Sequence, residues 1–472
     1  MINEYASLDA LALRDLIASG EVSAGEVVES AIGMAEQHND TVNAIVTPMY
    51  QSAADLARAP LSGPLAGVPF LVKDLTLVKD VRCSMGSRLW SDFVPDHDAD
   101  IVSRYRQAGL LIMGKSNTPE VGLAATTESV FLGPCRNPWD LTRTTGGSSG
   151  GAAAAVAAGI VPVAHATDGG GSIRIPASCC GLVGLKPTRG RTPLGPDVGE
   201  GWGAMATGHV VSRTVRDTAA LLDVTHGPAL GDPYHPPYFG GSFLADMAVD
   251  PGRLRIAIDL RPINDSKVHP DCLAGVERVA AQCVALGHEV TEVPLEYDRD
   301  LVGRAASALV AVNVRHNILA RAEALGVTPS LDLVEAATLR FVEWGGEVPA
   351  DLYVRSLHTI HSATRVIERF LLDYDLILSP TLLCPPPPLG YMDTNSPDEA
   401  TYAAHFNAFW GFTSLYNATG NPAISLPLHW TESGLPVGIQ FAAGFGREVL
   451  LLQIARQLEE ALPWRDQRAP LG

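Results

Sequence analysis

Residues 168–176 read DGGGSIRIP, with three consecutive glycines directly before Ser172. Such a run allows successive backbone N–H groups to turn towards one point, which is how an oxyanion hole forms without side chains. Glycine is used where the backbone turns tightly or approaches another group closely. The alternative is a glycine-rich loop that ends in a serine helix cap, and this stretch alone leaves both interpretations open.

A serine nucleophile at Ser172 needs a base, and the sequence offers two kinds. Histidine is the usual base. His165 is the only one of the 13 histidines in this serine-rich region, although a Ser-His-Asp triad assembled from distant residues stays open. Lys73 ends the apolar run of residues 68–72, where loss of water would lower the pKa of its amine and make the neutral form accessible. The alternative for Lys73 and Asp74 is a charged strand end that reaches water.

Two further stretches match catalytic motifs but stand in the wrong context. Residues 109–116 (GLLIMGKS) fit the Walker phosphate loop, yet a predicted helix precedes them and bulky apolar residues fill the variable positions, which favours a buried strand. Residues 146–150 (GGSSG) fit the nucleophile elbow of α/β-hydrolases, which requires a strand directly before it. The preceding residues 137–143 (NPWDLTR) are turn-rich and charged. We therefore favour a helix entry in which Ser149 caps a helix at 152–158.

Alternating helix and strand signals predict an α/β fold with a central sheet. Ser7 and Ser23 are predicted to cap two N-terminal helices, the first of which ends at Gly20. Residues 68–72 form the short apolar run that is typical of a buried strand. Further helix-to-strand steps are predicted at residues 98–113, 276–287 and 365–378.

Composition narrows the classes of function. The chain has 472 residues, 46% of them hydrophobic, and a formal net charge of −18, which argues against general binding to nucleic acid or to an anionic membrane. The first residues, MINEY, show neither the basic segment nor the apolar segment that a secretory signal would have. Seven cysteines without a C-x-x-C pair predict reduced thiols and a cytoplasmic location. We expect no metal and no cofactor, because no metal-ligand pattern occurs.

Several motifs together resemble the amidase signature family. Three of them are residues 67–74 (GVPFLVKD), 146–151 (GGSSGG) and 168–176, and the 24 positions between Ser148 and Ser172 also match the family. The resemblance covers nearly the whole chain. Within the family, the chain most resembles the 6-aminohexanoate cyclic-dimer hydrolases. The other matching stretches are 114–120 (GKSNTPE), 136–139 (RNPW), 184–190 (GLKPTRG), 421–427 (NPAISLP), 434–440 (GLPVGIQ) and 461–464 (ALPW).

The resemblance implies a fold and a catalytic triad. The fold would be α/β, with a mixed, twisted central sheet flanked by helices on both faces. By motif position, Ser172 is the nucleophile, Ser148 the bridging serine on a cis peptide, and Lys73 the base. The backbone N–H groups expected to hold the oxyanion are those of Gly169, Gly170, Gly171 and Ser172. The residues expected to support this loop are Asp168 and Arg174, as a pair that holds it, and Ser149, which orders it by hydrogen bonds.

We expect a single domain over residues 1–472, with a helical N-terminal arm at about 1–60 and a catalytic core at about 61–200. Insertions at about 200–245 and 300–420 are expected to line the pocket. Large aromatic residues pack in cores more often than they line sites. Their number here nevertheless suggests a roomy apolar pocket. The candidates for its walls are Trp202, Trp344, Tyr391, Phe406, Phe409 and Trp410.

The expected reaction is hydrolysis of the C–N bond of a small linear or cyclic amide through an acyl-enzyme. The same triad also suits a carbamate (urethane) or ester hydrolase, because attack on the carbonyl does not depend on the leaving atom. The A subunit of a tRNA-dependent amidotransferase shares the motifs, and a non-catalytic binding module is disfavoured because all three triad positions are intact. The expected partners are a small amide or carbamate and water, without nucleic acid or membrane. The oligomeric state stays open, a homodimer included.

Overall fold

The computed structural model describes residues 2, 4–264 and 266–471, and eleven strands within them form one mixed sheet. The strands run in the order β1-β3-β2-β8-β10-β9-β14-β15-β13-β11-β12. Their bounds are β1 Ile45–Pro48, β2 Pro69–Lys73, β3 Leu111–Ser116, β8 Val163–Asp168, β9 Val183–Lys186, β10 Thr207–Ser212, β11 Arg255–Ile258, β12 Glu289–Glu292, β13 Leu376–Pro380, β14 Ala423–Trp430 and β15 Pro436–Ala443. Strands β3, β2 and β8 are parallel, as are β13, β11 and β12, whereas the central strands pair antiparallel.

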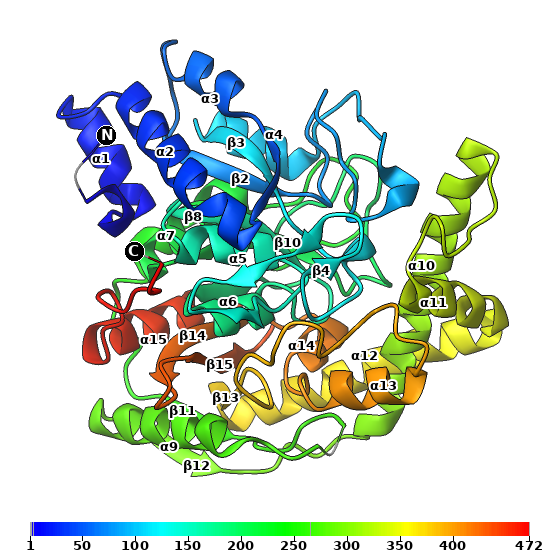
Figure 1. The fold of residues 1–472 in the computed structure, drawn as a ribbon. Coiled ribbons are helices and arrows are strands. Elements are labelled where there is room, and N and C mark those ends of the chain that lie inside the picture. Colours follow the sequence, from blue (N-terminus) through cyan, green and yellow to red (C-terminus); the bar gives the residue numbers. More distant parts are fainter. Residues whose placement is uncertain (1, 3, 265, 472) are drawn as a thin grey trace.

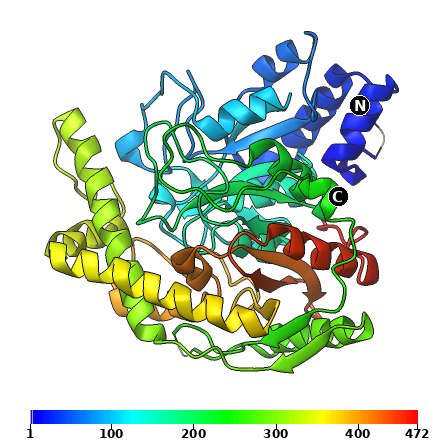
Figure 2. The same cartoon turned by 180° about the vertical axis from the view of Figure 1, so that it is seen from behind.

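Helices cover both faces of the sheet (Figures 1 and 2), which confirms the α/β class and the mixed sheet. In both views the C-terminal end of α10 projects on the side opposite the N-terminus, whereas the first half of this helix packs in a core cluster that includes residues of β13, β14 and β15. The helices are α1 Ala10–Ser19, α2 Ala24–Val42, α3 Tyr50–Leu56, α4 Asp100–Gln107, α5 Gly150–Ala157, α6 Arg174–Cys180, α7 Val215–Thr225, α8 Phe243–Asp246, α9 Pro270–Ala285, α10 Arg299–Leu325, α11 Ala336–Glu347, α12 Ala350–Asp373, α13 Glu399–Asn407, α14 Ser414–Thr419 and α15 Glu448–Ala461, with short 3₁₀ turns η1 Tyr5–Ser7, η2 Arg88–Trp90 and η3 Glu120–Gly122.

Strand β2 shows how the sequence directs Lys73. Side chains alternate between the two faces of a strand. Phe70 and Val72 pack in the cluster that includes α4 and α7, whereas Leu71 packs on the other face with α2 and α5. Lys73 is two positions beyond Leu71 and so points to the face covered by α5. Every residue of α5 is buried and its side chains are small, which allows the serines before it to approach the strand.

The N-terminal helices match the prediction except for one cap. Ser23 caps α2 in a reciprocal capping box with Glu26, and Gly20 ends α1 with a left-handed φ of 76°. The prediction that Ser7 caps α1 is wrong. Asp9 accepts the N–H of Ala12 instead, and an ion pair with Arg216 fixes this carboxylate in place.

The predicted helix-to-strand steps are confirmed as α4 to β3, α9 to β12 and α12 to β13. Because residues 111–116 form the buried strand β3 and a helix precedes them, residues 109–116 are not a phosphate loop. None of the helices in the described part of the chain combines the length and the apolar character that a membrane crossing requires.

Candidate active site

Lys73 lies at the end of β2 with its side chain fully buried. Its Nζ is 2.7 Å from Ser148 Oγ, 2.8 Å from Ser149 Oγ and 2.9 Å from Thr167 Oγ1. All three neighbours are hydroxyl groups. An ammonium group would donate to all three, whereas a neutral amine donates to two of them and offers its lone pair to the third.

Burial lowers the pKa of Lys73 well below its usual value of 10.5, because the ammonium form loses its water, and the negative charge of Asp168 opposes only part of this shift. Asp74 does not neutralise Lys73. It pairs with Lys115, whose Nζ is 3.1 Å from Asp74 Oδ1, and both of these side chains are fully buried. The interpretation of Lys73 and Asp74 as a charged strand end in water is therefore wrong.

His165 lies in β8 and is buried beside the backbone of Lys73. Its Nδ1 accepts the Lys73 N–H at 3.4 Å. Burial lowers the pKa of the His165 ring to about 3, so the ring is neutral. Among the described residues, no hydrogen bond joins this ring to Ser148 or Ser172. The structure thus brings Ser148 together with a lysine rather than with this histidine.

Thr167 is a contact of Lys73 that sequence analysis missed. It precedes Asp168 at the end of β8, and its backbone is tied to Ser149, whose Oγ accepts the Thr167 N–H and donates to the Thr167 carbonyl, each at 3.2 Å. The Ser149 hydroxyl is thus turned towards Lys73 and β8 rather than towards the N–H groups of α5, so it does not act as the helix cap that we had favoured.

Ser148 lies between a hairpin and α5, and its peptide bond with Gly147 is cis. The hairpin is formed by β6 (Arg136–Asn137) and β7 (Asp140–Thr144). A short strand therefore precedes the GGSSG motif, contrary to the turn-rich segment expected from the sequence. This strand is mostly half-buried and belongs to a separate two-stranded sheet, so it forms without an apolar run. The Ser148 hydroxyl contacts Lys73 rather than a histidine base. We therefore do not interpret the motif as an α/β-hydrolase elbow.

The glycine loop joins β8 to α6 and ends at Ser172, which is 9% exposed. Gly171 has a φ of 135°, a conformation that favours glycine, and a Cβ there would lie 2.4 Å from Thr413 Oγ1. The Gly171 N–H donates to Asp168 Oδ1 at 2.7 Å. Without substrate, this one of the four expected oxyanion donors is engaged by Asp168. In the described part of the chain, the N–H groups of Gly169, Gly170 and Ser172 have no protein partner.

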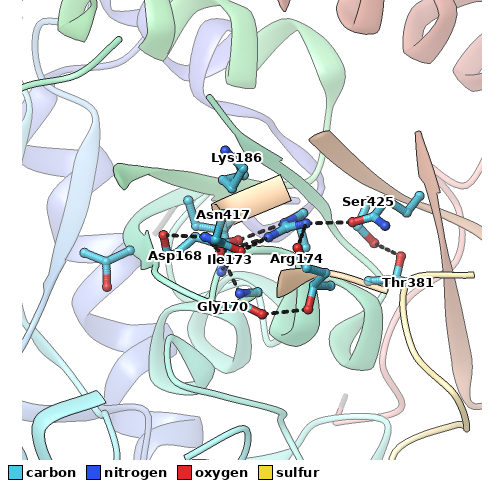
Figure 3. Close-up of polar contacts among 12 residues, drawn as sticks. Asp168, Gly170, Ile173, Arg174, Lys186, Thr381, Asn417 and Ser425 are labelled. Atoms are coloured by element: carbon cyan, nitrogen blue, oxygen red, sulfur yellow. Dashed lines mark hydrogen bonds and ion pairs between the residues drawn. The ribbon is translucent and has the colours of Figure 1, made fainter. Parts of the chain in front are cut away.

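A buried ion pair holds this loop (Figure 3). Arg174 Nε is 3.0 Å from Asp168 Oδ2, and its Nη2 is 3.0 Å from Oδ1. Burial alone would raise the pKa of Asp168, but the charge and hydrogen bonds of Arg174 lower it to about 2. Asn417 of α14 joins the pair, since it donates to Asp168 Oδ1 at 2.8 Å and accepts from Arg174 Nη2 at 2.6 Å. Sequence analysis missed Asn417.

A cavity of about 150 Å³ opens at Ser172. Gly169 and Gly170 line it, whereas Gly171 does not. Residues 122–125 form another part of the wall, and Ser148 lies directly behind it, since a Cβ at Gly122 would be 3.3 Å from Ser148 Oγ. Concave sites with mostly apolar walls and a few polar groups are typical of small-molecule binding.

Comparisons with known proteins show the family to which the chain belongs. The amidase family model matches residues 26–452. The chain belongs to the amidase signature family. Over 481 aligned residues it is 38% identical to 6-aminohexanoate-cyclic-dimer hydrolase from Paenarthrobacter ureafaciens, with 98% of this chain and 96% of the relative covered. It is 33% identical to an acylamidase from Rhodococcus erythropolis, with 98% and 97% covered. The solved structure of 6-aminohexanoate cyclic dimer hydrolase complexed with substrate matches at a TM-score of 0.92 and 35% identity over 99% of both chains. The protein is thus a hydrolase of amide C–N bonds.

The pocket aromatics of this amidase are only partly those expected. Trp202, Phe406 and Trp410 line the cavity. The other three candidates do not line it. Phe409 is fully buried in a core cluster, which is the role that large aromatic residues have more often, Tyr391 stacks on His405 with ring centroids 3.9 Å apart, and Trp344 is 39% exposed. From the insertion at about 200–245, only Trp202 and Met205 line the cavity among the described residues.

Phe341 of α11 lines the cavity of this amidase and was missed. The buried positions of α11 are Ala337, Thr338, Val342 and Gly345, which define the inward face of the helix. Phe341 continues this face at helical spacing. The sequence alone does not separate the two rings, because Trp344 also stands at a helical spacing of seven positions from Ala337.

Replacing Asp168 with asparagine in this amidase is expected to lower the free energy of unfolding by about 3–5 kcal/mol, because it leaves the buried charge of Arg174 unpaired. Urea denaturation at pH 7 measures this. The pKa of Asp168 lies at about 2 in the folded state, below the usual 3.8. The contribution of the Asp168 charge to the free energy of unfolding is therefore fully present above pH 3.8 and is lost as the pH falls towards 2.

The control for Asp168→Asn is Asp140→Asn. Asp140 Oδ2 is 3.5 Å from Arg143 Nε, and both side chains are about one-third exposed. Such surface pairs contribute about 0–1 kcal/mol, so this variant should unfold almost as the parent does. Equal effects of the two substitutions at pH 7 would contradict the role given to the buried pair.

Proposed function

We propose that this amidase hydrolyses a small linear or cyclic amide through an acyl-enzyme, with Ser172 as the nucleophile, Ser148 as the proton relay and Lys73 as the base. The observation that carries the proposal is the 2.7 Å contact between Lys73 Nζ and Ser148 Oγ. It lies in a fully buried setting that lowers the pKa of the amine and so favours its neutral form.

The first half of the reaction forms the acyl-enzyme. Neutral Lys73 takes the proton of Ser148 while Ser148 takes that of Ser172, and Ser172 Oγ forms a bond to the amide carbon. The electron pair of the carbonyl moves to its oxygen, which accepts hydrogen bonds from the free N–H groups of the glycine loop. One such donor is worth about 3–4 kcal/mol.

The second half releases the products. The C–N bond breaks, and the proton held by Lys73 returns through Ser148 to the leaving amine. Water then attacks the acyl group with the help of the same relay, the carboxylic acid leaves, and the proton restores Ser172. The Ser172 hydroxyl has no hydrogen bond to Ser148 in the described structure. We expect that bond to form when substrate binds, since catalytic hydrogen bonds are often long without substrate.

The relatives support an amide as substrate. One is named a hydrolase of 6-aminohexanoate cyclic dimer and another an acylamidase. The proposed relay would also serve a carbamate or an ester, since the attack does not depend on the leaving atom. Rates on an amide, a carbamate and an ester of one acyl group therefore define the reaction class.

Peptide mapping after reaction with a fluorophosphonate tests the nucleophile. We expect an adduct on Ser172 alone, together with loss of amide hydrolysis at the same rate. Label on Ser148 in its place would contradict the assignment and restore a search for a histidine base. A protein that hydrolyses amides without any serine label would contradict it as well.

Hydrolysis by the purified chain alone tests the reaction class. We expect ammonia release from propionamide without ATP, tRNA or added subunits. Dependence on ATP and tRNA would instead favour the A subunit of an amidotransferase, which transfers ammonia rather than releasing it.

A further inference from the structure

One wall of the cavity at Ser172 is a face of α10 made of small side chains. Gly303, Ala306, Ser307 and Val310 line the cavity, and their spacing of three, four and seven positions places them on one face of the helix. A Cβ at Gly303 would meet only Ile263, at 3.9 Å. The cavity extends from the nucleophile to α10 because these side chains leave the space unfilled.

Trp202 forms a second wall in an unusual backbone conformation. Its φ is 55°, and Gly203 and Ala204 follow with φ of 67° and 66°. A bulky residue with positive φ is strained, and such strain is found where the surroundings hold a functional geometry. Arg189 Nε donates to the Ala204 carbonyl at 2.6 Å and holds the turn. The indole ring lies against the glycine loop, since a Cβ at Gly169 would be 2.7 Å from Trp202 Cε3.

The cavity wall carries no ionisable side chain among the described residues that line it. Among the lining residues, Ser172, Ser307, Ser414, Trp202 and Trp410 carry polar side-chain groups, none of them ionised. The Ser414 hydroxyl and the Trp410 N–H are themselves buried without a hydrogen-bond partner in the described structure. A charged substrate group that entered this space would lose its water without gaining an ion partner. The formal charge of −18 further disfavours the approach of an anion.

We propose that Trp202 and the small face of α10 determine substrate specificity: they select uncharged amides whose apolar chain, of limited length, extends from the scissile carbonyl between this indole and this helix. The inference rests on the proposed function, because it needs acyl transfer at Ser172. The α10 face limits the length of the substrate's apolar chain. Trp202 limits how broad the substrate can be beside its reacting carbonyl.

A matched set of three amides tests the selection against charge. Heptanamide, 6-aminohexanamide and adipamate have chains of equal length that end in a methyl group, an ammonium group and a carboxylate. We expect kcat/KM of the unaltered enzyme for heptanamide to exceed both others by about 100-fold or more, because the charged ends lose water in the cavity. Equal or higher kcat/KM for either charged amide would overturn the proposal.

Ala306→Leu tests the length limit. The added side chain fills the far part of the cavity, so the ratio of kcat/KM for heptanamide to that for propionamide should fall by about 10- to 200-fold, the range typical of small volume changes in apolar pockets. Ala320→Leu is the matched control, since it makes the same change at an exposed position of α10 and should leave the ratio unaltered. An unchanged ratio in Ala306→Leu would overturn the role of α10, and Gly303→Val provides an independent variant on the same face.

Trp202→Gly tests the width. Glycine adopts the positive φ without strain, so the turn keeps its conformation while the indole is removed. We expect kcat/KM for a branched amide, 2-ethylhexanamide, to rise at least about tenfold relative to propionamide. Trp344→Ala is the control, because this exposed ring does not line the cavity. An unchanged preference in Trp202→Gly would overturn the role of Trp202.

Different results would overturn the proposed function and the proposed specificity. If the unaltered protein hydrolyses no amide and takes no fluorophosphonate on Ser172, the proposed function itself is overturned. If it is labelled on Ser172 and hydrolyses propionamide but does not discriminate by charge or length, only the specificity inference is overturned.

Discussion

Replacing Ser172 with alanine is expected to lower kcat for amide hydrolysis by about 10⁴- to 10⁶-fold, the loss typical of removing a nucleophile that acts as one unit with its base. Substrate binding should change little, because the cavity walls and the N–H groups of Gly169 and Gly170 remain. The loss should therefore appear in kcat rather than in KM. Ammonia release from heptanamide under saturating and limiting conditions separates the two constants.

The Ser172→Ala variant should fold as the parent does. In the described structure the Ser172 hydroxyl has no hydrogen-bond partner, so its removal leaves no buried donor or acceptor unpaired. Ser52→Ala, at an exposed position of α3, is the control and should keep full activity. Retention of the parent's kcat in Ser172→Ala, with an unchanged melting temperature, would remove Ser172 from the mechanism.

Replacing Lys73 with methionine is expected to lower kcat/KM by about 10²- to 10⁴-fold, the usual contribution of a general base. The pH profile gives the sharper test. Burial lowers the pKa of Lys73, so the neutral base is present at a lower pH than for a lysine in water. As the pH falls through that lowered pKa, the amine binds a proton and kcat/KM of the parent should fall about tenfold per pH unit.

The acid limb of this profile should vanish in Lys73→Met, whose remaining activity has no amine to titrate. Lys73→Arg is the matched variant that keeps a positive charge, and it should be as inactive, because a guanidinium group does not accept a proton. Methionine has a chain of similar length, but Ser148, Ser149 and Thr167 lose their contact with Nζ, so thermal denaturation is needed to show that the variant is folded under the assay conditions. An acid limb that is unchanged in Lys73→Met would show that another group titrates.

The sequence by itself determined which local elements form. An apolar run of residues 68–72 specifies a buried strand with Lys73 at its end, and the alanines of residues 152–158 specify a helix that can be buried on every side. Three glycines before Ser172 specify a loop with free N–H groups, because no side chain blocks the turn. These properties depend on residues that are neighbours in the chain. The strand and the helix were predicted at these positions, whereas the glycine stretch by itself left a serine helix cap open.

Only the tertiary structure decided which distant groups meet. Thr167 and Asn417 became partners of Lys73 and Asp168 because β2, β8 and α14 converge, and nothing in the local sequence encodes those distances. The carboxylate of Asp168 also accepts the Gly171 N–H, one of the four expected oxyanion donors. Packing also chose Phe341 over Trp344 for the cavity. Hydrogen bonds and apolar contacts act over a few ångströms, so chain patterns specify elements, whereas the assembled fold specifies the neighbours on which the chemistry depends.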